Sequence, residues 1–265
     1  MGTAIKSAKK SLSRFASNRF LFEELVKRDF EHKYKRTVLG MAWSVLSPLL
    51  TLLVMKLVFT QFFGRTTPHY TIYLFAGNIV MAYFKEATNN GMTSMISNAS
   101  VINKINVPKY LFLFSKNVSS LVNFGLTLVV FFIFCIIDHI TFRPSFLMLI
   151  FPIMCLVIMN IGIGMILSAL YVFFRDVKYL YSVFLTLLTY LSAIFYTVDQ
   201  FPEKVQTLFL LNPVYVIIKY FRMIVIDGVI PSLQYHGLCL AYAALFALIG
   251  AFFYKRYNRK FVYYF

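Results

Sequence analysis

Long apolar segments separated by short polar ones dominate the chain after residue 37. A membrane-spanning helix needs roughly 20 apolar residues, and six segments approach or exceed that length. They lie at about residues 38–63, 71–97, 111–137, 146–174, 179–196 and 234–254. The pattern therefore predicts an all-α membrane protein with six transmembrane helices in one transmembrane domain, residues 38–265.

The first 37 residues form a separate polar region with two amphipathic pieces. In the second piece one apolar face recurs at every fourth position: Phe22, Val26, Phe30 and Tyr34. A basic helix with such a face lies in the membrane interface, so we expect an amphipathic interface helix here. The alternative is a solvated helix packed on a soluble partner.

Several residues inside the predicted spans stand out. Lys85 and Glu86 fall near the middle of the second span, where charges face a bundle interior or a wet cavity. As neighbours they point in different directions, so pairing with other helices and lining a cavity are both open. Pro48 is expected to kink the first span. Gly162 and Gly164 indicate close helix packing.

Two segments are neither spans nor ordinary loops. Residues 199–233 hold two short apolar pieces, Val205–Leu211 and Val214–Ile226, broken at Asn212 and Pro213. This length predicts re-entrant or interfacial helices on the outer side. Residues 98–110 predict a short amphipathic helix on the cytoplasmic side.

The charge of the chain is large and uneven. The 265 residues are 60% hydrophobic and 14% charged, with a formal net charge of +16. Most of the 26 Lys and Arg fall in loops on one side of the predicted spans. By the positive-inside rule this side is cytoplasmic, and both termini lie there. Anionic lipid headgroups explain the surplus better than nucleic acid does.

Catalytic chemistry is missing from the sequence. There is no Gly-Lys pair and hence no phosphate-binding loop of the Walker type. The four histidines are scattered and the three cysteines sit in apolar runs, so no metal site or acid–base cluster is predicted. These features favour a passage through the membrane, with no catalytic residue, metal or cofactor of its own.

Five motifs together resemble one family. KYKRTVLGMAWSVLSPLL is similar to the start of the first span in permease subunits of ABC-2 type polysaccharide and polyol-phosphate exporters, which move O-antigen, capsule or teichoic-acid chains. NKINVPKYLFLFSK resembles their coupling segment and VFFRDVKYL their Arg-Asp turn after the fourth span. YLSAIFYTVDQFP and LLNPVYVIIKYFR resemble their outer segment after the fifth span. The order and spacing of these motifs cover almost the whole chain.

The resemblance implies a transport subunit of the bacterial cytoplasmic membrane. A homodimer would work with two copies of a separate ATPase, which binds ATP and Mg²⁺, and would export a glycan carried on a polyprenyl diphosphate. The expected substrate channel comprises Trp43, Ser47, Thr51, Thr186, Tyr190 and Tyr196. The expected headgroup site comprises Lys33, Tyr34, Lys35 and Arg36. The expected ATPase-coupling residues are Val101, Ile102, Lys104, Ile105, Val107, Pro108 and Lys109. Arg175 and Asp176 are expected to brace the cytoplasmic turn between the fourth and fifth spans.

The sequence departs from the family pattern at Ala193. The family often has a proline after the serine in the outer half of the fifth span, whereas Ala193 follows Ser192 here. We therefore expect that a local bend is absent at this point of the outer gate, residues 199–233 and the end of the preceding span.

Other functions stay open beside glycan export. The same fold could export a lipid or a drug. An intramembrane acyl- or glycosyltransferase would need a clustered His, Asp or Glu site, and an ion channel would need a charged ring or filter loop.

Overall fold

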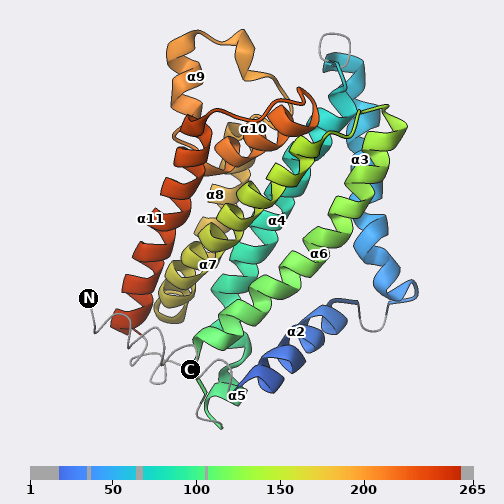
Figure 1. The fold of residues 1–265 in the computed structure, drawn as a ribbon. Coiled ribbons are helices and arrows are strands. Elements are labelled where there is room, and N and C mark those ends of the chain that lie inside the picture. Colours follow the sequence, from blue (N-terminus) through green and yellow to red (C-terminus); the bar gives the residue numbers. More distant parts are fainter. Residues whose placement is uncertain (1–17, 35–36, 64–67, 105–106, 258–265) are drawn as a thin grey trace.

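The computed structural model describes residues 18–34, 37–63, 68–104 and 107–257. Within these ranges the chain is helical and contains no strand (Figure 1). The longest helices are α4 (Tyr70–Ser97), α6 (Tyr110–Ile137), α7 (Ile150–Phe173) and α11 (Leu233–Tyr257). They run side by side and make the body of the molecule. This confirms the predicted all-helical class.

Helix α4 lies at the centre of this bundle. It packs against α6, α7 and α3, and its first half is buried: Ile72, Phe75 and Ile79 are each at most 1% exposed. The aromatic ring of Phe75 meets Phe131 of α6 edge-on, at 5.3 Å between centroids. Because the neighbouring helices surround α4, its polar second half is shielded from the surroundings of the bundle.

Glycines let three helices of the bundle touch through their backbones. A Cβ atom on Gly162 of α7 would overlap the backbone of α11 at Phe246, and one on Gly250 of α11 would overlap the backbone of Gly162. Gly91 of α4 meets Gly164 of α7 in the same way, at 2.9 Å from the Gly164 Cα to a Cβ built on Gly91. The predicted close packing at Gly162 and Gly164 is confirmed.

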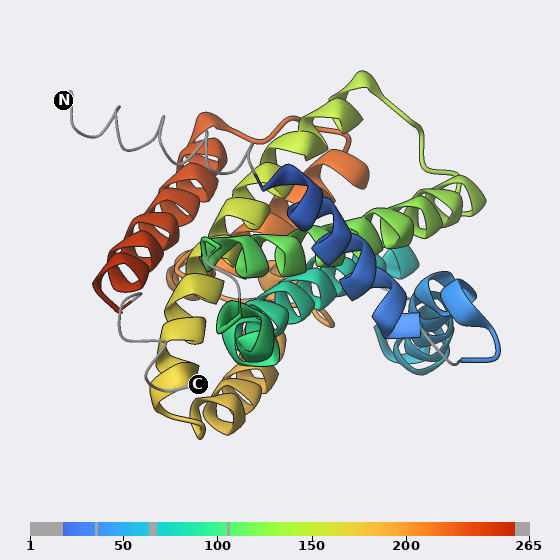
Figure 2. The same cartoon turned by 90° about the horizontal axis from the view of Figure 1, so that it is seen from below.

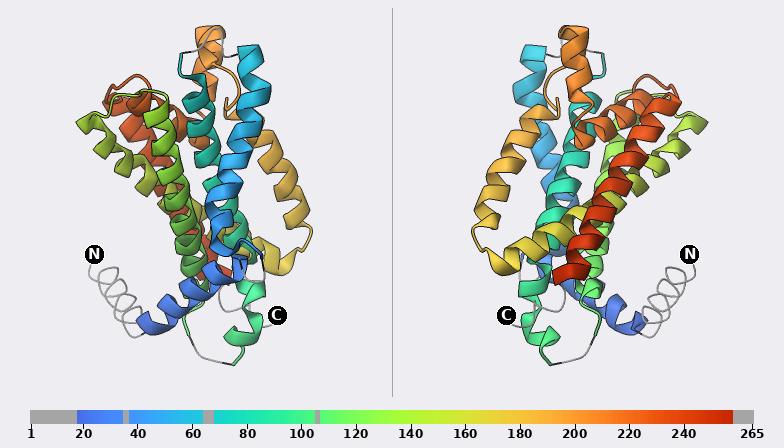
Figure 3. Two further views of the ribbon diagram at one scale, coloured as in Figure 1. Left: turned by 90° about the vertical axis from the view of Figure 1, so that its right-hand side faces the viewer. Right: turned by 90° about the vertical axis from the view of Figure 1, so that its left-hand side faces the viewer.

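Three further helices lie at the rim. Helix α3 (Trp43–Phe63) and helix α8 (Val177–Leu191) stand at the edge of the bundle, and α2 (Arg19–Tyr34) crosses its lower end against α6 (Figures 2 and 3). Gly40 (φ +51°) begins the short 3-10 helix η1 (Gly40–Ala42) that leads from α2 into α3. A left-handed backbone at this turn favours glycine.

The opposite end is closed by short elements. A 3-10 helix, η2 (Pro144–Leu149), precedes α7, and η3 (Val198–Gln200) leads to α9 (Glu203–Phe209) and α10 (Pro213–Val225). The α9 and α10 axes differ by 105° across the predicted break. The Asn212 side chain caps α10 by accepting from the amides of Val214 (3.0 Å) and Tyr215 (3.3 Å), with Pro213 at the first helical position.

Within the described ranges, three helical stretches are long and apolar enough to span a membrane on their own: Tyr110–Ile137, Pro144–Phe173 and Leu233–Tyr257. The α9–α10 pair reaches that length only as one broken segment. Helix α4 is long but polar in its second half, and the apolar helices Trp43–Phe59 and Val177–Leu191 are shorter. The predicted fifth span ends at Leu191 and not at residue 196, because the chain turns at Ala193 (φ +48°). The expectation that a bend is absent there is wrong.

Candidate functional site

A polar cavity of about 620 Å³ lies between α3, α4 and α6. Helix α3 contributes one face with the residues Trp43, Ser44, Ser47, Pro48 and Thr51. Helix α4 contributes Asn78, Tyr83, Lys85 and Glu86, and α6 contributes Ser120, Asn123, Phe124 and Thr127. Hydroxyl, amide and aromatic groups alternate along this wall. We call it the α3–α4–α6 cavity.

The α3 wall is polar because three hydroxyl residues recur at helical spacing. Ser44, Ser47 and Thr51 share one face of a helix that is otherwise strongly apolar. The Thr51 hydroxyl donates to the Ser47 carbonyl oxygen at 2.9 Å, so its hydrogen already has an acceptor within the helix. The Thr51 hydroxyl oxygen can still accept a hydrogen bond. Trp43 adds an aromatic surface that is 37% exposed. Pro48 lies inside α3, and the kink predicted there stays a prediction.

A second cavity, of about 650 Å³, lies between α2, α4 and α6. Its wall consists of Arg28, Asp29, Lys33, Glu86, Asn90, Ser97, Lys116 and Ser119. We call it the α2 cavity. Three cationic side chains and two carboxylates share this space, so its surroundings carry a net positive charge. It lies at the end of the bundle where α2 crosses.

The two cavities meet at one ion pair. The Lys33 ammonium of α2 lies 3.0 Å from Glu86 Oε1 of α4, and Asn123 of α6 donates to Glu86 Oε2 at 3.0 Å. Both Lys33 and Glu86 line both cavities. Lys85, the neighbour of Glu86 on α4, is half-buried on the wall of the α3–α4–α6 cavity. Pairing with another helix and lining a cavity were both open for Lys85 and Glu86. Glu86 does both, and Lys85 lines the cavity.

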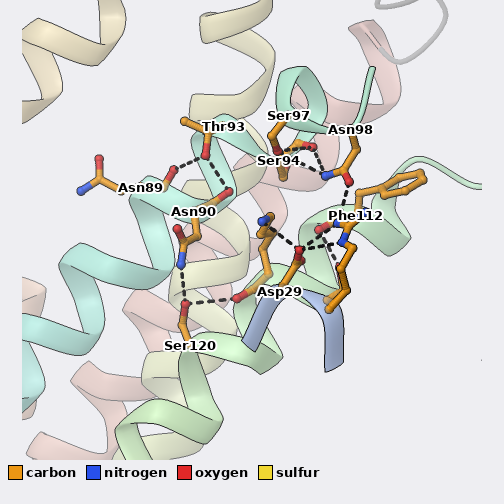
Figure 4. Close-up of polar contacts among 12 residues, drawn as sticks. Asp29, Asn89, Asn90, Thr93, Ser94, Ser97, Asn98, Phe112 and Ser120 are labelled. Carbon is orange, nitrogen blue, oxygen red and sulfur yellow. Dashed lines mark hydrogen bonds and ion pairs between the residues drawn. The ribbon is translucent and has the colours of Figure 1, made fainter. Parts of the chain in front are cut away.

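Helix α2 is fastened to the bundle by a second polar group of contacts (Figure 4). Asp29 Oδ1 of α2 lies 3.1 Å from the Lys116 ammonium of α6 and accepts from Arg28 Nη2 at 2.8 Å. The same Arg28 nitrogen donates to Asn98 Oδ1 of α4 at 2.8 Å. Leu25 adds an apolar contact and is 4% exposed. Leu25, Arg28 and Asp29 are three and four positions apart, so α2 packs on its own chain through one face that carries both apolar and charged residues.

At the opposite end of the bundle, Arg222 of α10 is buried at 6% exposure, and no carboxylate among the described residues pairs with it. Its guanidinium donates to three backbone carbonyl oxygens: Tyr73 (3.1 and 3.2 Å), Ala193 (2.9 Å) and Ile194 (3.2 Å). The Ala193 and Ile194 carbonyls are free to accept because α8 ends at Leu191. Gly77 makes room for the guanidinium, since a Cβ there would lie 2.8 Å from Arg222 Nη2. Arg222 was not among the residues predicted to have a function.

Comparison with known proteins settles the family. The family model described as "ABC-2 type transporter" matches residues 21–226, which hold the cavities, α2 and the Arg222 contacts. The chain belongs to the ABC-2 type transporter family. The resemblance seen in its five motifs is confirmed.

Named relatives fall within polysaccharide export. The chain is 30% identical over 235 residues to the O-antigen export system permease protein RfbA of Klebsiella pneumoniae, covering 86% of this chain and 89% of that protein. It is 23% identical over 243 residues to the polysialic acid transport protein KpsM of Escherichia coli (91% and 93% covered). A further relative is the capsule polysaccharide export inner-membrane protein CtrC of Neisseria meningitidis, 22% identical over 192 residues (71% and 72% covered).

In this ABC-2 type chain the predicted channel residues separate into two groups. Trp43, Ser47 and Thr51 line the α3–α4–α6 cavity together. On α8 it is Thr189 that reaches this cavity, whereas Thr186 and Tyr190 are exposed on the surface of the chain. Thr186 and Tyr190 were predicted to line the channel, but the sequence alone does not show which side of α8 faces inward.

Tyr196 lies beyond the end of α8 and belongs to the same end of the molecule as Arg222. Its hydroxyl donates to the Tyr190 carbonyl oxygen at 2.8 Å, and its own carbonyl oxygen accepts from the Tyr73 hydroxyl at 2.7 Å. These bonds hold the turn after α8 in place.

The predicted coupling helix is shorter than expected. Helix α5 covers only Ala99–Ile102. Ile102, predicted as an ATPase-coupling residue, is 8% exposed and belongs to a buried apolar cluster with Leu25 of α2 and Phe112 of α6, so its side chain faces the bundle. The outward positions are Asn103 and Lys104, which are exposed. Ile105 lies outside the described residues.

Arg175 and Asp176 make contacts within their own turn. Arg175 lies over the ring of Tyr171 at 5.4 Å, and the Asp176 carbonyl oxygen accepts from the amides of Tyr179 and Leu180. Both contacts are local to the turn between α7 and α8, where a bracing role was predicted. Lys35 and Arg36 lie outside the described residues, as does the side chain of Tyr34.

Proposed function

We propose that this chain is the membrane-spanning permease of an ATP-driven exporter. Its cargo is a lipid-linked polysaccharide such as an O-antigen, capsular or teichoic-acid chain, moved from the cytoplasm to the outer side of the bacterial cytoplasmic membrane. The observation that carries the proposal is the meeting of two polar cavities at the Lys33–Glu86 pair, inside a bundle of apolar helices. The names of the ABC-2 type relatives support the same cargo class.

The lining of the α3–α4–α6 cavity suits a sugar chain. Sugar hydroxyls both donate and accept hydrogen bonds, and serine, threonine and asparagine side chains do the same. Ser47, Thr51 and Asn123 therefore offer contacts that do not depend on one particular sugar sequence. Trp43 offers an aromatic face on which the C–H side of a sugar ring can stack.

The α2 cavity suits the diphosphate of the lipid carrier. Arg28, Lys33 and Lys116 surround it, and charge-assisted hydrogen bonds from such groups to phosphate oxygens are short and strong. By the positive-inside rule the α2 end faces the cytoplasm, where the cargo is made. Six spans with both termini cytoplasmic follow if α3, α4 and α8 each cross the membrane.

The polar wall of the α3–α4–α6 cavity favours a homodimer, in which a second copy of the chain shields the wall from lipid. Polar groups facing hydrocarbon without partners are costly, and the α3–α4–α6 cavity lies beside the rim helices α3 and α8. The outer face of α8 is apolar and exposed: Tyr179, Leu180, Val183, Leu187 and Tyr190 are each more than half exposed. A homodimer formed along α3 and α8 encloses the cavity between two copies.

ATP hydrolysis is assigned to a separate ATPase, two copies of which bind ATP and Mg²⁺ and dock at the α2 end. Asn103 and Lys104, exposed after α5, are the contact points that the chain offers there. Since Ile102 packs on α2 and α6, movement of this segment can be passed directly to both helices.

The experiment that tests this function is co-purification with the ATPase encoded beside the chain, followed by hydrolysis measurements with defined lipid-linked glycans. We expect a four-chain complex whose hydrolysis rises with a lipid-linked glycan and not with the free lipid carrier. Stimulation by a drug or a phospholipid alone would instead support an exporter of that cargo.

The dimer is tested by cross-linking in membranes. The described chain has only buried cysteines, Cys135, Cys155 and Cys239, so a Val183→Cys variant carries one reactive thiol on α8. We expect a disulfide-linked dimer from this variant and none from Leu248→Cys on α11, which is equally exposed at 72%. The reverse result contradicts the α3–α8 seam.

A further inference from the structure

A third cavity, of about 290 Å³, lies at the end of the bundle opposite α2. We call it the η3 cavity. Its walls come from the start of α4, from η3 and from one face of α10. On α10 this face carries Lys219 and Met223 at four-residue spacing, and Asp227 follows just after the helix end. Thr197 and Asp199 approach from the η3 side.

The two carboxylates of the η3 cavity are not used by the fold. Among the described side chains no hydrogen bond or ion pair reaches the carboxylate of Asp199 or Asp227. Burial, together with the nearby charge of Asp199, raises the pKa of Asp227, whereas Lys219 opposes this change. The cavity thus places two acceptor groups near each other with hydrogen-bonding capacity to spare.

The ammonium group of Lys219 is a hydrogen-bond donor in the η3 cavity that the fold also leaves without an ionic partner among the described residues. The Lys219 ammonium lies over the rings of Tyr215 (6.0 Å) and Tyr235 (5.7 Å), and it forms no ion pair with a described carboxylate. Tyr73 and Tyr215 supply aromatic walls, and Arg222 lies behind them. The site therefore combines acceptors, a donor and ring surfaces.

Charge balance decides which ligand fits. Asp199 and Asp227 are matched by Lys219 and Arg222, so the formal charge around the cavity is zero. A divalent cation prefers a cage of oxygen ligands and would lie beside two cations here. A phosphate would meet two carboxylates. An uncharged ligand with several hydroxyl groups can accept from Lys219 and donate to both carboxylates.

We propose that the η3 cavity binds a single uncharged pyranose unit, whose hydroxyls donate to Asp199 and Asp227 and accept from Lys219. The volume of about 290 Å³ lies just below the usual range for small-ligand sites, which begins at about 300 Å³, so it suits one ring and not a longer chain. This inference rests on the proposed glycan cargo: the cavity lies at the exit end, so it receives a sugar unit after the passage through the bundle.

The test uses the complete chain in lipid nanodiscs together with its ATPase. Saturation-transfer NMR is recorded with millimolar glucose, galactose, mannose and N-acetylglucosamine as probes. We expect a signal from at least one of these sugars, reduced at least fivefold in the Asp199→Ala/Asp227→Ala variant. Glu203→Ala is the matched control, because it removes an exposed carboxylate at the same end of the molecule but outside the cavity wall. Thr197→Phe, which fills the cavity, should abolish the same signal.

Co-purification with the ATPase confirms that each variant is folded. No signal from any of the four sugars with the unmodified chain overturns the inference, as does a signal that persists in both cavity variants. Glycan-stimulated ATP hydrolysis is measured on the same samples. If stimulation is present and the sugar signal is absent, only the η3 site is wrong; if stimulation is absent, the proposed export function fails.

Discussion

The guanidinium of Arg222 lies flat over the ring of Tyr73, with 3.4 Å between the guanidinium carbon and the ring centroid. The Tyr73 hydroxyl reaches beyond the ring to the Tyr196 carbonyl oxygen at 2.7 Å. Together the two side chains join α4, α10 and the turn after α8. No carboxylate pairs with this buried cation among the described contacts, so its charge is balanced by carbonyl dipoles and the ring quadrupole.

Replacing Arg222 should loosen this end of the bundle. In Arg222→Met the carbonyl oxygens of Tyr73 and Ile194 lose the guanidinium as a donor, and that of Ala193 keeps only the Tyr73 hydroxyl at 3.5 Å. Each buried acceptor left unsatisfied costs about 1–3 kcal/mol. Arg222→Lys should restore little, because an ammonium lacks the planar fork that reaches three acceptors. We expect a lower melting temperature for both variants of the purified protein. Arg175→Lys, at the opposite end, serves as the control; equal melting temperatures for all three would contradict this account.

Gly162→Ala should separate α7 from α11. The added methyl overlaps the backbone at Phe246, and backbone cannot move aside as a flexible side chain can. Overpacking of this kind costs about 1–3 kcal/mol. Gly125→Ala in α6 is the matched control, because a Cβ there meets nothing within 4 Å. Thermal unfolding of the two variants should differ clearly, with Gly125→Ala unchanged or slightly stabilised by its better helix propensity.

Exchanging the charges of Lys33 and Glu86 tests the pair at which the two cavities meet. We expect Lys33→Glu and Glu86→Lys each to reduce export, because each places two like charges together. The double exchange should recover part of the activity, since the pair is restored and the Asn123 amide can turn its oxygen toward the new ammonium. Both groups are partly exposed, so the coupling should be modest and weaken with salt. Additive losses would show that the two side chains act independently and that their pairing does not contribute to export.

The wall of the α3–α4–α6 cavity can be tested without disturbing the fold. Ser47→Leu removes a hydroxyl from the wall and adds volume to the passage, and we expect export to fall by roughly tenfold, which corresponds to about 1.4 kcal/mol. Thr141→Leu makes a comparable change at an exposed position between α6 and η2, outside the cavity wall. Surface glycan and the amount of protein in the membrane are measured for each. Equal export by the two variants would exclude the cavity as the path.

Much of this architecture is predictable from the sequence because the membrane leaves few alternatives. The helix positions follow from apolar length, and the break at Asn212 and Pro213 follows from the loss of a backbone donor. The cavity face of α3 is visible as hydroxyl residues at helical spacing, and the packing role of Gly162 follows from its apolar surroundings.

The features that the sequence did not predict depend on contacts between segments that are far apart along the chain. Arg222 bonds to backbone oxygens 29 and 149 positions earlier in the chain, and a carbonyl acceptor leaves no mark on the sequence. Ile102 was expected to contact the ATPase, but it lies in a buried apolar cluster with residues of α2 and α6 that are distant or separate in the sequence. Ala193 has no propensity for a left-handed backbone; the bonds around Arg222 hold it there.

The glycine contacts described above also determine which parts of the protein can change position. Helices α4, α7 and α11 touch backbone to backbone at Gly91, Gly164, Gly162 and Gly250, so sliding or parting them would break close backbone contacts. These three helices form a rigid frame. A transport cycle must then be carried by the elements outside that frame, α2, α3 and α8, and distances measured between α7 and α11 should stay constant while distances from α8 to α4 change.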